Sequence, residues 1–321
     1  MALFLVKRAA ESAFVLILGS LLVFTFIRLI PGDPAAAMYG DQLQKLTEAD
    51  RLRISENLGL DEPLPVQYVH WASQVLQGNW GASYLTGEPA DEVIVRTLLP
   101  TAVLLIVSQV LMIGLALLFG LTSALRRDSL YDRTVLAVSV LLMAIPPFWL
   151  ALMMMLFFSI RLGVLPSSGM GAGPFSIRHL ILPALVIALS HAGYYIRLFR
   201  NHFAASSSGG HLLALRARGV PYRRIVLSHI LPNAAAPLIV YTGASLAVSL
   251  AGSVVVETIF SWPGLGRLAL KSALAHDYPV LLAIVLLSMA FVILVNLLAG
   301  LLAAWIDPRL READTEGGAR W

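Results

Sequence analysis

The chain has 321 residues, of which 58% are hydrophobic and only 13% are charged, and its net charge is +4. A soluble domain carries about 25% charged residues, so this composition excludes an ordinary soluble protein and indicates a polytopic membrane protein. The absence of cysteine excludes disulfide bonds, thiolate metal sites and a cysteine nucleophile. Because the basic residues flank apolar runs, membrane orientation explains the positive charge better than nucleic-acid binding does.

The N-terminal part combines one predicted membrane span with a long polar segment. Residues 9–30 form an apolar run that is long enough to cross a bilayer and has no signal-peptide cleavage site at its end. The motif Arg28-Leu-Ile-Pro-Gly-Asp-Pro34 stops this helix, because two prolines and a glycine cannot continue it. Residues 35–97 are predicted to be extramembrane, with amphipathic helices at 42–57 and 66–76 and with Trp71 and Trp80 as interfacial aromatics.

Five further apolar runs complete a predicted fold of six transmembrane helices, in an all-α polytopic protein. They cover residues 98–125, 136–160, 180–199, 233–256 and 280–306. Pro146 and Pro147 must kink or break the third span near its middle, and such backbone is tolerated at membrane depth only against protein or a cavity. A glycine- and proline-rich loop covers 161–178, the loop 257–279 contains a predicted helix at 265–275, and a charged tail closes the chain.

The distribution of charge predicts the orientation. With six spans, both termini lie on the same side of the membrane. Most of the Lys and Arg residues fall in the segments on that side, and most of the Asp and Glu residues fall on the other. The positive-inside rule therefore places both termini and the loop at 200–230 in the cytoplasm, and the protein in the cytoplasmic (inner) membrane.

The loop between the fourth and fifth spans is the most basic stretch of the chain. Residues 201–232 contain no acid and hold Arg216, Arg218, Arg223 and Arg224. Gly219 is predicted to end a helix over 211–218, and Pro221 to start the next one. Either the segment is a solvated basic loop that obeys the positive-inside rule, or it docks a cytoplasmic partner. The chain lacks a phosphate-binding Gly-x4-Gly-Lys-Ser/Thr motif, so any ATP that it depends on would have to be bound by another chain, which agrees with docking.

The fifth span carries two patterns with a four-residue period. Small residues that permit close helix packing are Gly243, Ala247 and Ala251. A polar stripe consists of Ser245, Ser249, Ser253 and Glu257. The stripe is interpreted as the lining of a polar path that ends at an acid near the outer mouth. The alternative is that the serines bond backbone carbonyls of their own helix and that Glu257 is an interfacial residue.

His191 is the histidine that falls within a predicted span. An ionisable side chain at that depth is a candidate functional residue beside the polar path, and a satisfied packing role is the alternative. None of the seven histidines shows the paired spacing of a metal site, so neither a metal site nor a catalytic residue is predicted.

Short motifs are distributed along nearly the whole chain, and their order and spacing together are specific. They are Arg28–Pro34, Leu58–Tyr68, Leu99–Thr101, Ile145–Leu150, Leu165–Gly169, Ala217–Gly219, Glu257–Arg267, Asp277–Val280 and Asp307–Arg309. In these motifs the chain resembles the inner-membrane permeases of binding-protein-dependent ABC importers, in the oligopeptide, dipeptide and nickel branch.

The resemblance implies a type I importer fold in which the last five helices form the core. The expected organisation is an N-terminal helix and signature (1–34), an extracytoplasmic segment (35–97), a five-helix transmembrane domain (98–306) and a cytoplasmic tail (307–321). It also implies a heteromeric complex with a second homologous permease, two cytoplasmic ATPase subunits and an extracytoplasmic substrate-binding protein. ATP and Mg²⁺ would be bound by the ATPase subunits, and no cofactor by this chain.

The same resemblance places a coupling helix in the basic loop. The family's consensus there is Glu-Ala-Ala, three residues, then Gly, which aligns with Leu213, Ala214, Leu215 and Gly219, so Leu213 stands where Glu is expected. The expected coupling residues are Leu212, Leu213, Ala214, Leu215, Arg216, Ala217, Arg218 and Gly219. The three leucines are expected to fill a groove of the ATPase, with the two arginines at its rim.

The substrate implied by the resemblance is a di- or oligopeptide, nickel or a metal chelate. The short loop at 161–178 favours nickel or a chelate. Two other classes of function compete with transport. An integral-membrane enzyme would need convergent acids, a Ser/His pair or metal ligands within the spans, where only His191 and scattered serines are present. The basic cytoplasmic segment argues against a scaffold without transport, because a scaffold would not explain it.

Overall fold

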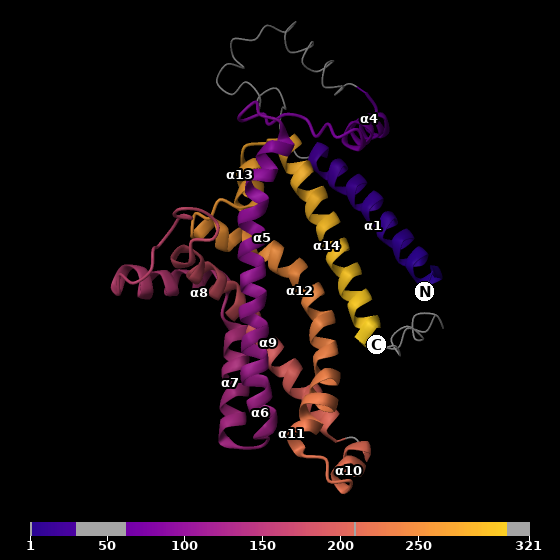
Figure 1. The fold of residues 1–321 in the computed structure, drawn as a ribbon. Coiled ribbons are helices and arrows are strands. Elements are labelled where there is room, and N and C mark those ends of the chain that lie inside the picture. Colours follow the sequence, from indigo (N-terminus) through magenta and orange to yellow (C-terminus); the bar gives the residue numbers. More distant parts are fainter. Residues whose placement is uncertain (1, 30–61, 209, 307–321) are drawn as a thin grey trace, which may run out of the picture. The chain divides into compact units, whose positions relative to one another are not determined.

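The computed structural model describes residues 2–29, 62–208 and 210–306, and in these ranges all named elements are helices (Figure 1). They are α1 (Ala2–Leu29), α4 (Leu64–Leu76), α5 (Ala90–Leu115), α6 (Leu121–Leu125), α7 (Leu130–Ala144), α8 (Pro147–Met154), α9 (Ile177–Ser207), α10 (Gly210–Ala217), α11 (Tyr222–Ile225), α12 (Leu231–Ile259), α13 (Leu265–Leu274) and α14 (Tyr278–Ile306). Short π-helical segments cover Ala116–Gly120, Met155–Arg161 and Val226–Ile230. The predicted helix at 42–57 and the tail at 307–321 lie outside the described residues.

The predicted six-helix membrane fold is confirmed. Five helical stretches of the described chain are long and apolar enough to span a bilayer, and a bent pair supplies the sixth. The five are Ala9–Leu29, Ala90–Leu125, Ile177–Ser207, Tyr222–Ile259 and Tyr278–Leu302, and the pair is Leu130–Ala144 with Pro147–Arg161. The predicted short helices at 66–76, 211–218 and 265–275 correspond to α4, α10 and α13.

The third span is broken rather than kinked, since α7 and α8 meet at 102° (Figure 1). Pro147 lacks an amide hydrogen, and each proline pushes the residue before it out of the helical region, so Ile145 and Pro146 are extended. The span also begins earlier than predicted, at Leu130 instead of 136, because the Ser129 side chain caps the helix by accepting a hydrogen bond from the Asp132 amide (3.2 Å).

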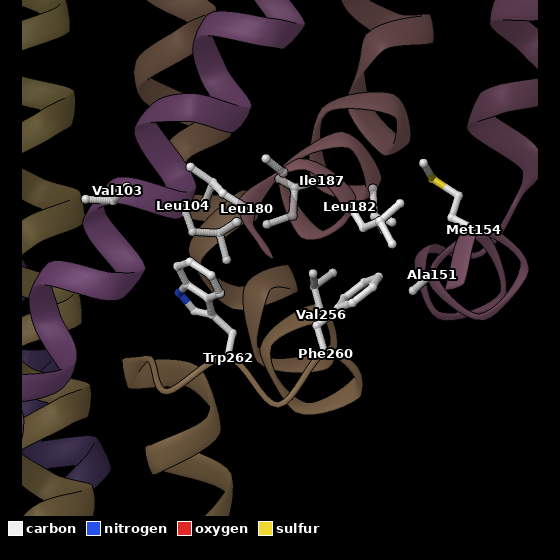
Figure 2. Close-up of a cluster of buried hydrophobic side chains, with 12 residues drawn as sticks. Val103, Leu104, Ala151, Met154, Leu180, Leu182, Ile187, Val256, Phe260 and Trp262 are labelled. Carbon is white, nitrogen blue, oxygen red and sulfur yellow. The ribbon is translucent and has the colours of Figure 1, made fainter. Parts of the chain in front are cut away.

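The described chain divides into two compact units, and the larger comprises residues 102–262 together with the chain from 292 onward. Its helices pack mainly on α9. One hydrophobic cluster surrounds Trp262 and Phe260, which contact apolar side chains of α5 and α9, among them Leu104 and Ile187 (Figure 2). Trp262 is completely buried. The bulky residues Phe260 and Trp262 of the 257–267 motif therefore belong to the core at the end of α12.

Glycine permits a very close contact between α7 and α9 in this unit. A Cβ atom built on Gly193 would lie 2.1 Å from the carbonyl oxygen of Ser139, a distance that real Cβ atoms essentially never show. The two backbones therefore touch directly. A second cluster continues along α9 through Tyr195, Phe199 and Phe203, and holds the segment that follows this helix.

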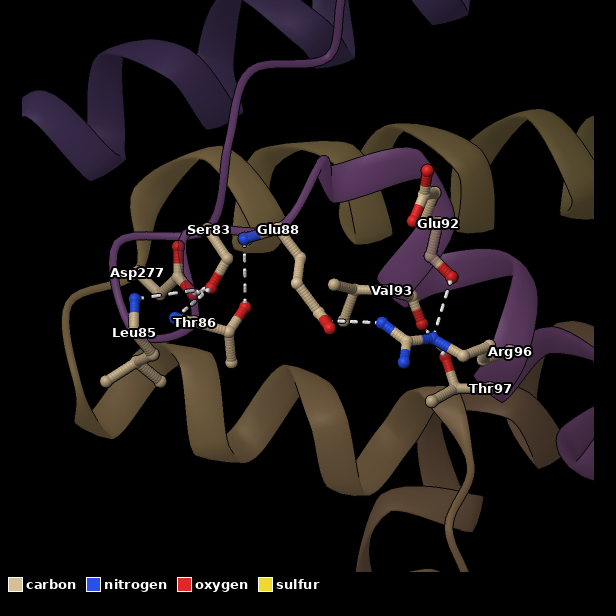
Figure 3. Close-up of polar contacts among 9 residues, drawn as sticks. All are labelled: Ser83, Leu85, Thr86, Glu88, Glu92, Val93, Arg96, Thr97 and Asp277. Atoms are coloured by element: carbon tan, nitrogen blue, oxygen red, sulfur yellow. Dashed lines mark hydrogen bonds and ion pairs between the residues drawn. The ribbon is translucent and has the colours of Figure 1, made fainter.

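The smaller unit comprises residues 2–101 and 263–291. Its polar centre is Asp277, which is buried and accepts hydrogen bonds from the Ser83 hydroxyl (2.5 Å) and the Tyr84 amide (3.0 Å). Ser83 also accepts from the backbone amides of Leu85 and Thr86, so the loop before α5 is fastened to the turn between α13 and α14 (Figure 3). Burial raises the pKa of the Tyr84 phenol in this loop above its ordinary value.

Candidate functional site

Helix α10 ends in a glycine cap that its sequence explains. Gly219 has a positive φ of 77°, the left-handed conformation that glycine adopts most readily. Its amide donates to the carbonyl of Arg216 (2.9 Å), and the amide of Val220 donates to the carbonyl of Leu215 (3.1 Å). This pair of bonds is a Schellman motif, which satisfies carbonyls that the end of a helix would otherwise leave unpaired. The predicted helix end at Gly219 is therefore correct.

Apolar side chains fasten α10 to the body of the larger unit. Leu212 is only 2% exposed and joins the cluster that contains Phe203 and Ile225. Leu215 and Val220, the two residues joined across the cap, pack against the same cluster. On the other side of the corner, the Arg216 guanidinium lies 5.1 Å from the ring centroid of Tyr222 in α11. The helix is thus held at both ends as a rigid short element.

This packing corrects the expected arrangement of the docking side chains. Leu212 was expected to fill a groove of a partner, but it is buried in the chain's own core, and Leu215 is partly buried there. The side chain of Leu213 lies outside the described residues. Pro221, expected to start the next helix, is extended and lies directly before its first residue, Tyr222.

The exposed residues of α10 and its cap are small or basic, and α11 adds two arginines and the exposed ring of Tyr222. The small and basic residues are Ala214, Arg216, Ala217, Arg218 and Gly219 on and after α10, and Arg223 and Arg224 on α11. Within the described chain no ion pair joins any of these four arginines to an acid. The segment therefore presents a basic surface with small residues at its centre, and the only apolar anchors that the structure describes point inward.

A buried ion pair lies at the same end of α9 and was not predicted from the sequence. Arg200 of α9 donates through Nε to Asp132 Oδ1 (2.9 Å) and through Nη2 to Asp132 Oδ2 (2.6 Å). Asp132 is buried, and it also accepts bonds from the Ser123 hydroxyl and from the Asp128 amide. This carboxylate joins α6, α7 and α9, and Arg200 precedes α10 in the chain by only a few turns.

The predicted polar stripe of α12 lies inside the chain. Ser245, Ser249, Ser253 and Glu257 are all buried. The Ser245 hydroxyl lies 3.2 Å from Gln109 Nε2 of α5, and the hydroxyls of Ser245 and Ser253 donate to backbone carbonyls three residues earlier in their own helix. The described structure therefore shows the stripe as packed interior rather than as the lining of an exposed path.

The small-residue face of α12 contributes to packing through Gly243. A Cβ atom at Gly243 would lie 2.5 Å from the Cβ atom of Ala299 in α14, so the glycine lets these two helices approach closely. Both residues belong to the larger unit. The predicted close-packing role of the small residues is thus visible at this position.

An aromatic surface joins α9 and α12 one turn before the first serine of that stripe. The rings of Tyr194 and Tyr241 stack with centroids 4.6 Å apart, and the Tyr195 hydroxyl donates to the carbonyl of Tyr241 (2.9 Å). Tyr241 is 39% exposed and Tyr194 is partly exposed. His191 lies one turn before Tyr194, and its Nδ1 is 3.0 Å from the carbonyl oxygen of Ile187. Tyr241 precedes Ser245 by four residues and so extends the period of the stripe, but the predicted stripe begins at Ser245.

Comparison with known proteins gives consistent matches over nearly the whole chain. The model for "Binding-protein-dependent transport system inner membrane component" matches residues 116–312, and the model for the N-terminal part of such membrane components matches residues 1–90. A probable peptide ABC transporter permease protein, y4tP of Sinorhizobium fredii, is 33% identical and covers 97% of this chain and 100% of its own length.

Two other relatives are similar to the same extent. The metal-staphylopine import system permease protein CntB of Staphylococcus aureus is 35% identical over 96% of this chain and 98% of its own. The oligopeptide transport system permease protein AppB of Bacillus subtilis is 35% identical over 97% of this chain and 99% of its own. Among solved structures, an inward-facing MetNI methionine ABC transporter matches with a TM-score of 0.57 and 19% identity, over 67% of this chain and 96% of that chain. This likeness shows a shared fold.

Proposed function

Because the chain belongs to the binding-protein-dependent transport system inner membrane component family, we propose that it forms half of the membrane pathway of an ATP-driven importer, beside a second homologous permease. The chain is a permease subunit of an ABC importer, embedded in the membrane as a multi-pass protein. In the proposed complex, two cytoplasmic ATPase subunits bind ATP and Mg²⁺, and an extracytoplasmic binding protein delivers the substrate. Both termini of this chain are cytoplasmic in this arrangement.

The capped helix α10 is the observation that carries the proposal. ATP can shift a transporter between two conformations only through contacts that differ between them, so some rigid element must carry ATPase movement into the membrane. Helix α10 fits this role because its inner face is packed into the α9 core and its outer face offers small and basic residues. Ala214, Ala217 and Arg218 are therefore the proposed contacts with the ATPase, while Leu212 and Leu215 transmit the movement inward.

The experiment that tests this role is purification of the tagged full chain from membranes that also contain its operon partners. We expect two ATPase subunits and a second permease to co-purify, and ATP-dependent uptake to require all of them in proteoliposomes. A chain that transports, or catalyses a reaction, without any ATPase would contradict the proposal.

For the substrate we propose a small peptide or a metal chelate of similar size. Relatives are named for peptide, oligopeptide, glutathione and metal-staphylopine transport. These names support both peptides and metal chelates as substrate classes and do not decide between them. Calorimetric titration of the cognate binding protein discriminates them. One series uses di- and tripeptides, and the other uses nickel with and without a small carboxylate-rich chelator. Binding of neither series would contradict the proposed range.

We place the pathway surface of this chain at the exposed aromatic face rather than along the buried serines. Tyr194 and Tyr241 offer stacked rings and hydroxyl groups at the seam between α9 and α12, and His191 extends this face by one turn. The serines Ser245, Ser249 and Ser253 follow Tyr241 along α12 but are buried, and there they stabilise the approach of α12 to its neighbours.

Replacing Tyr241 by alanine is expected to lower uptake about two- to tenfold, because one aromatic contact is worth about 0.5–1.5 kcal/mol. Uptake by Tyr241→Phe should stay close to that of the parent, since the ring remains. Val240→Ala, at the exposed apolar position beside Tyr241 but on another side of α12, is the matched control and should transport normally. Equal uptake by Tyr241→Ala and the parent, at equal membrane abundance, would remove Tyr241 from the pathway.

A further inference from the structure

Helix α4 lacks charged residues and packs on the first membrane span. Its sequence, LPVQYVHWASQVL, contains no Asp, Glu, Lys or Arg. The Tyr68 hydroxyl and the Ser20 hydroxyl of α1 are 2.8 Å apart. The rings of Tyr68 and Trp71 lie 5.6 Å and 5.3 Å from that of Phe24, also on α1. One face of α4 is thus fixed against the second half of α1.

These contacts set the level of α4 along the span. Ser20 precedes Leu29, the last residue of the span, by nine residues, which is about 14 Å along a helix axis. The hydrogen bond holds the Tyr68 backbone within the reach of one tyrosine side chain from Ser20. This reach is shorter than the distance along α1 from Ser20 to Leu29. The middle of α4 therefore lies beside the last turns of the span and not beyond its end.

The opposite face of α4 is apolar and open. Leu76 is 88% exposed, Val69 is 65% exposed and Val66 is 47% exposed. Ser73, between them on the helix surface, turns its hydroxyl back to the carbonyl of His70 (2.7 Å), which hides its polarity. The polar side chains of His70 and Gln74 are one turn apart on a single edge, and His70 Nδ1 lies 3.9 Å from the Glu62 carboxylate just outside the helix.

We propose that α4 is an interfacial helix immersed in the bilayer beside the end of α1, with Val66, Val69 and Leu76 against lipid acyl chains and with His70 and Gln74 toward water. An amphipathic helix with a large apolar sector and a narrow polar edge lies in this way in the boundary between headgroups and acyl chains. The predicted extramembrane position of residues 66–76 would then be wrong, although their predicted helix is correct.

Continuity with the lipid-facing surface of α1 identifies lipid as the occupant. Phe14, Ile17 and Phe26 of α1 are each more than 60% exposed, as expected for a span that is surrounded by hydrocarbon. The apolar face of α4 begins at the same level, because Tyr68 and Trp71 contact that span. A soluble partner would meet a helix without any charge on the exposed face, and could not reach the level of Ser20 without entering the bilayer. This inference depends on α1 crossing the membrane and is independent of the proposed transport.

The absence of cysteine makes the test direct, since single cysteines can be introduced into the otherwise unchanged full chain. Spin labels are attached at Val69→Cys and Gln74→Cys in the complex, reconstituted in phosphatidylethanolamine–phosphatidylglycerol vesicles. Phe14→Cys on α1 is the control for lipid, and Thr86→Cys, in the exposed loop before α5, is the control for water. Collision of each label with oxygen, which dissolves in lipid, is compared with collision with a water-soluble nickel chelate.

The label at Val69 is expected to behave like that at Phe14, at a depth of about 5–10 Å below the headgroups. The label at Gln74 is expected to behave like that at Thr86. A Val69 label that collides mainly with the nickel chelate would overturn the proposal, because α4 would then face water. A Val69 label that is immobile and shielded from both reagents would overturn it too, because a protein subunit would then cover this face.

Discussion

Replacing Gly219 by valine is expected to uncouple ATP hydrolysis from uptake while leaving membrane insertion intact. The left-handed conformation at this position costs a residue with a Cβ atom about 1–2 kcal/mol, and a β-branched residue more. Open space surrounds the position, so the effect comes from the backbone and not from a clash. The two cap hydrogen bonds weaken, the end of α10 loosens, and ATPase movement is lost before it reaches the α9 core. Separate assays of substrate uptake and of ATP hydrolysis in proteoliposomes show whether the two are uncoupled.

The chain offers two matched controls for this experiment. Gly219→Asn should retain most of the coupling, because asparagine tolerates the left-handed conformation better than other residues. Gly78 ends α4 with the same pair of cap bonds and has a φ of 84° in open space, so Gly78→Val imposes the same strain elsewhere. Normal uptake by Gly219→Val would contradict the proposed coupling role of α10. An equal loss in Gly78→Val would mean that any strained cap lowers transport.

Removing one partner of the Asp132–Arg200 pair is expected to be the most destabilising polar substitution in the larger unit. Asp132→Asn leaves the Arg200 guanidinium facing an amide instead of a carboxylate, and breaking a buried pair in this way costs about 3–5 kcal/mol. The loss should appear as a lower free energy of unfolding in detergent micelles and as less protein in the membrane.

The double variant Asp132→Leu with Arg200→Met should recover most of that loss, because apolar residues can replace a buried pair when both charges leave together. The exposed pair between Glu88 and Arg96 is the matched control. Glu88→Gln should change the free energy of unfolding by less than about 1 kcal/mol, since both side chains are solvated. A small effect of Asp132→Asn, equal to that of Glu88→Gln, would show that the pair does not brace these helices.

Properties that depend on neighbouring residues in the sequence could be predicted. The spans follow from long apolar runs, the break of the third span from two adjacent prolines, and the end of α10 from one glycine. The pair of Asp132 and Arg200 could not be predicted, because 68 positions separate the residues and each alone resembles an ordinary charge near the end of a span. Only the contact of α7 with α9 brings them together.

Periodicity alone does not tell which environment a helix face meets. A four-residue period places Ser245, Ser249 and Ser253 on one side of α12, and this side is equally compatible with a polar path and with a tightly packed interior. The leucines of α10 illustrate the same ambiguity. An apolar residue such as Leu212 can fill a partner's groove or its own core, and only the position of Phe203 and Ile225 decides between them.

The break between α7 and α8 bears on the order in which the chain enters the membrane during synthesis. Helix α7 has 15 residues, or about 22 Å, which is shorter than the hydrocarbon core of about 30 Å. Because α8 departs from its axis by 102°, it cannot extend α7 to the other side as a straight rod. The backbone contact between Ser139 and Gly193 shows that α7 depends on α9, which leaves the ribosome later. We therefore expect the third span to reach its final position in the bilayer only after α9 has been synthesised and inserted.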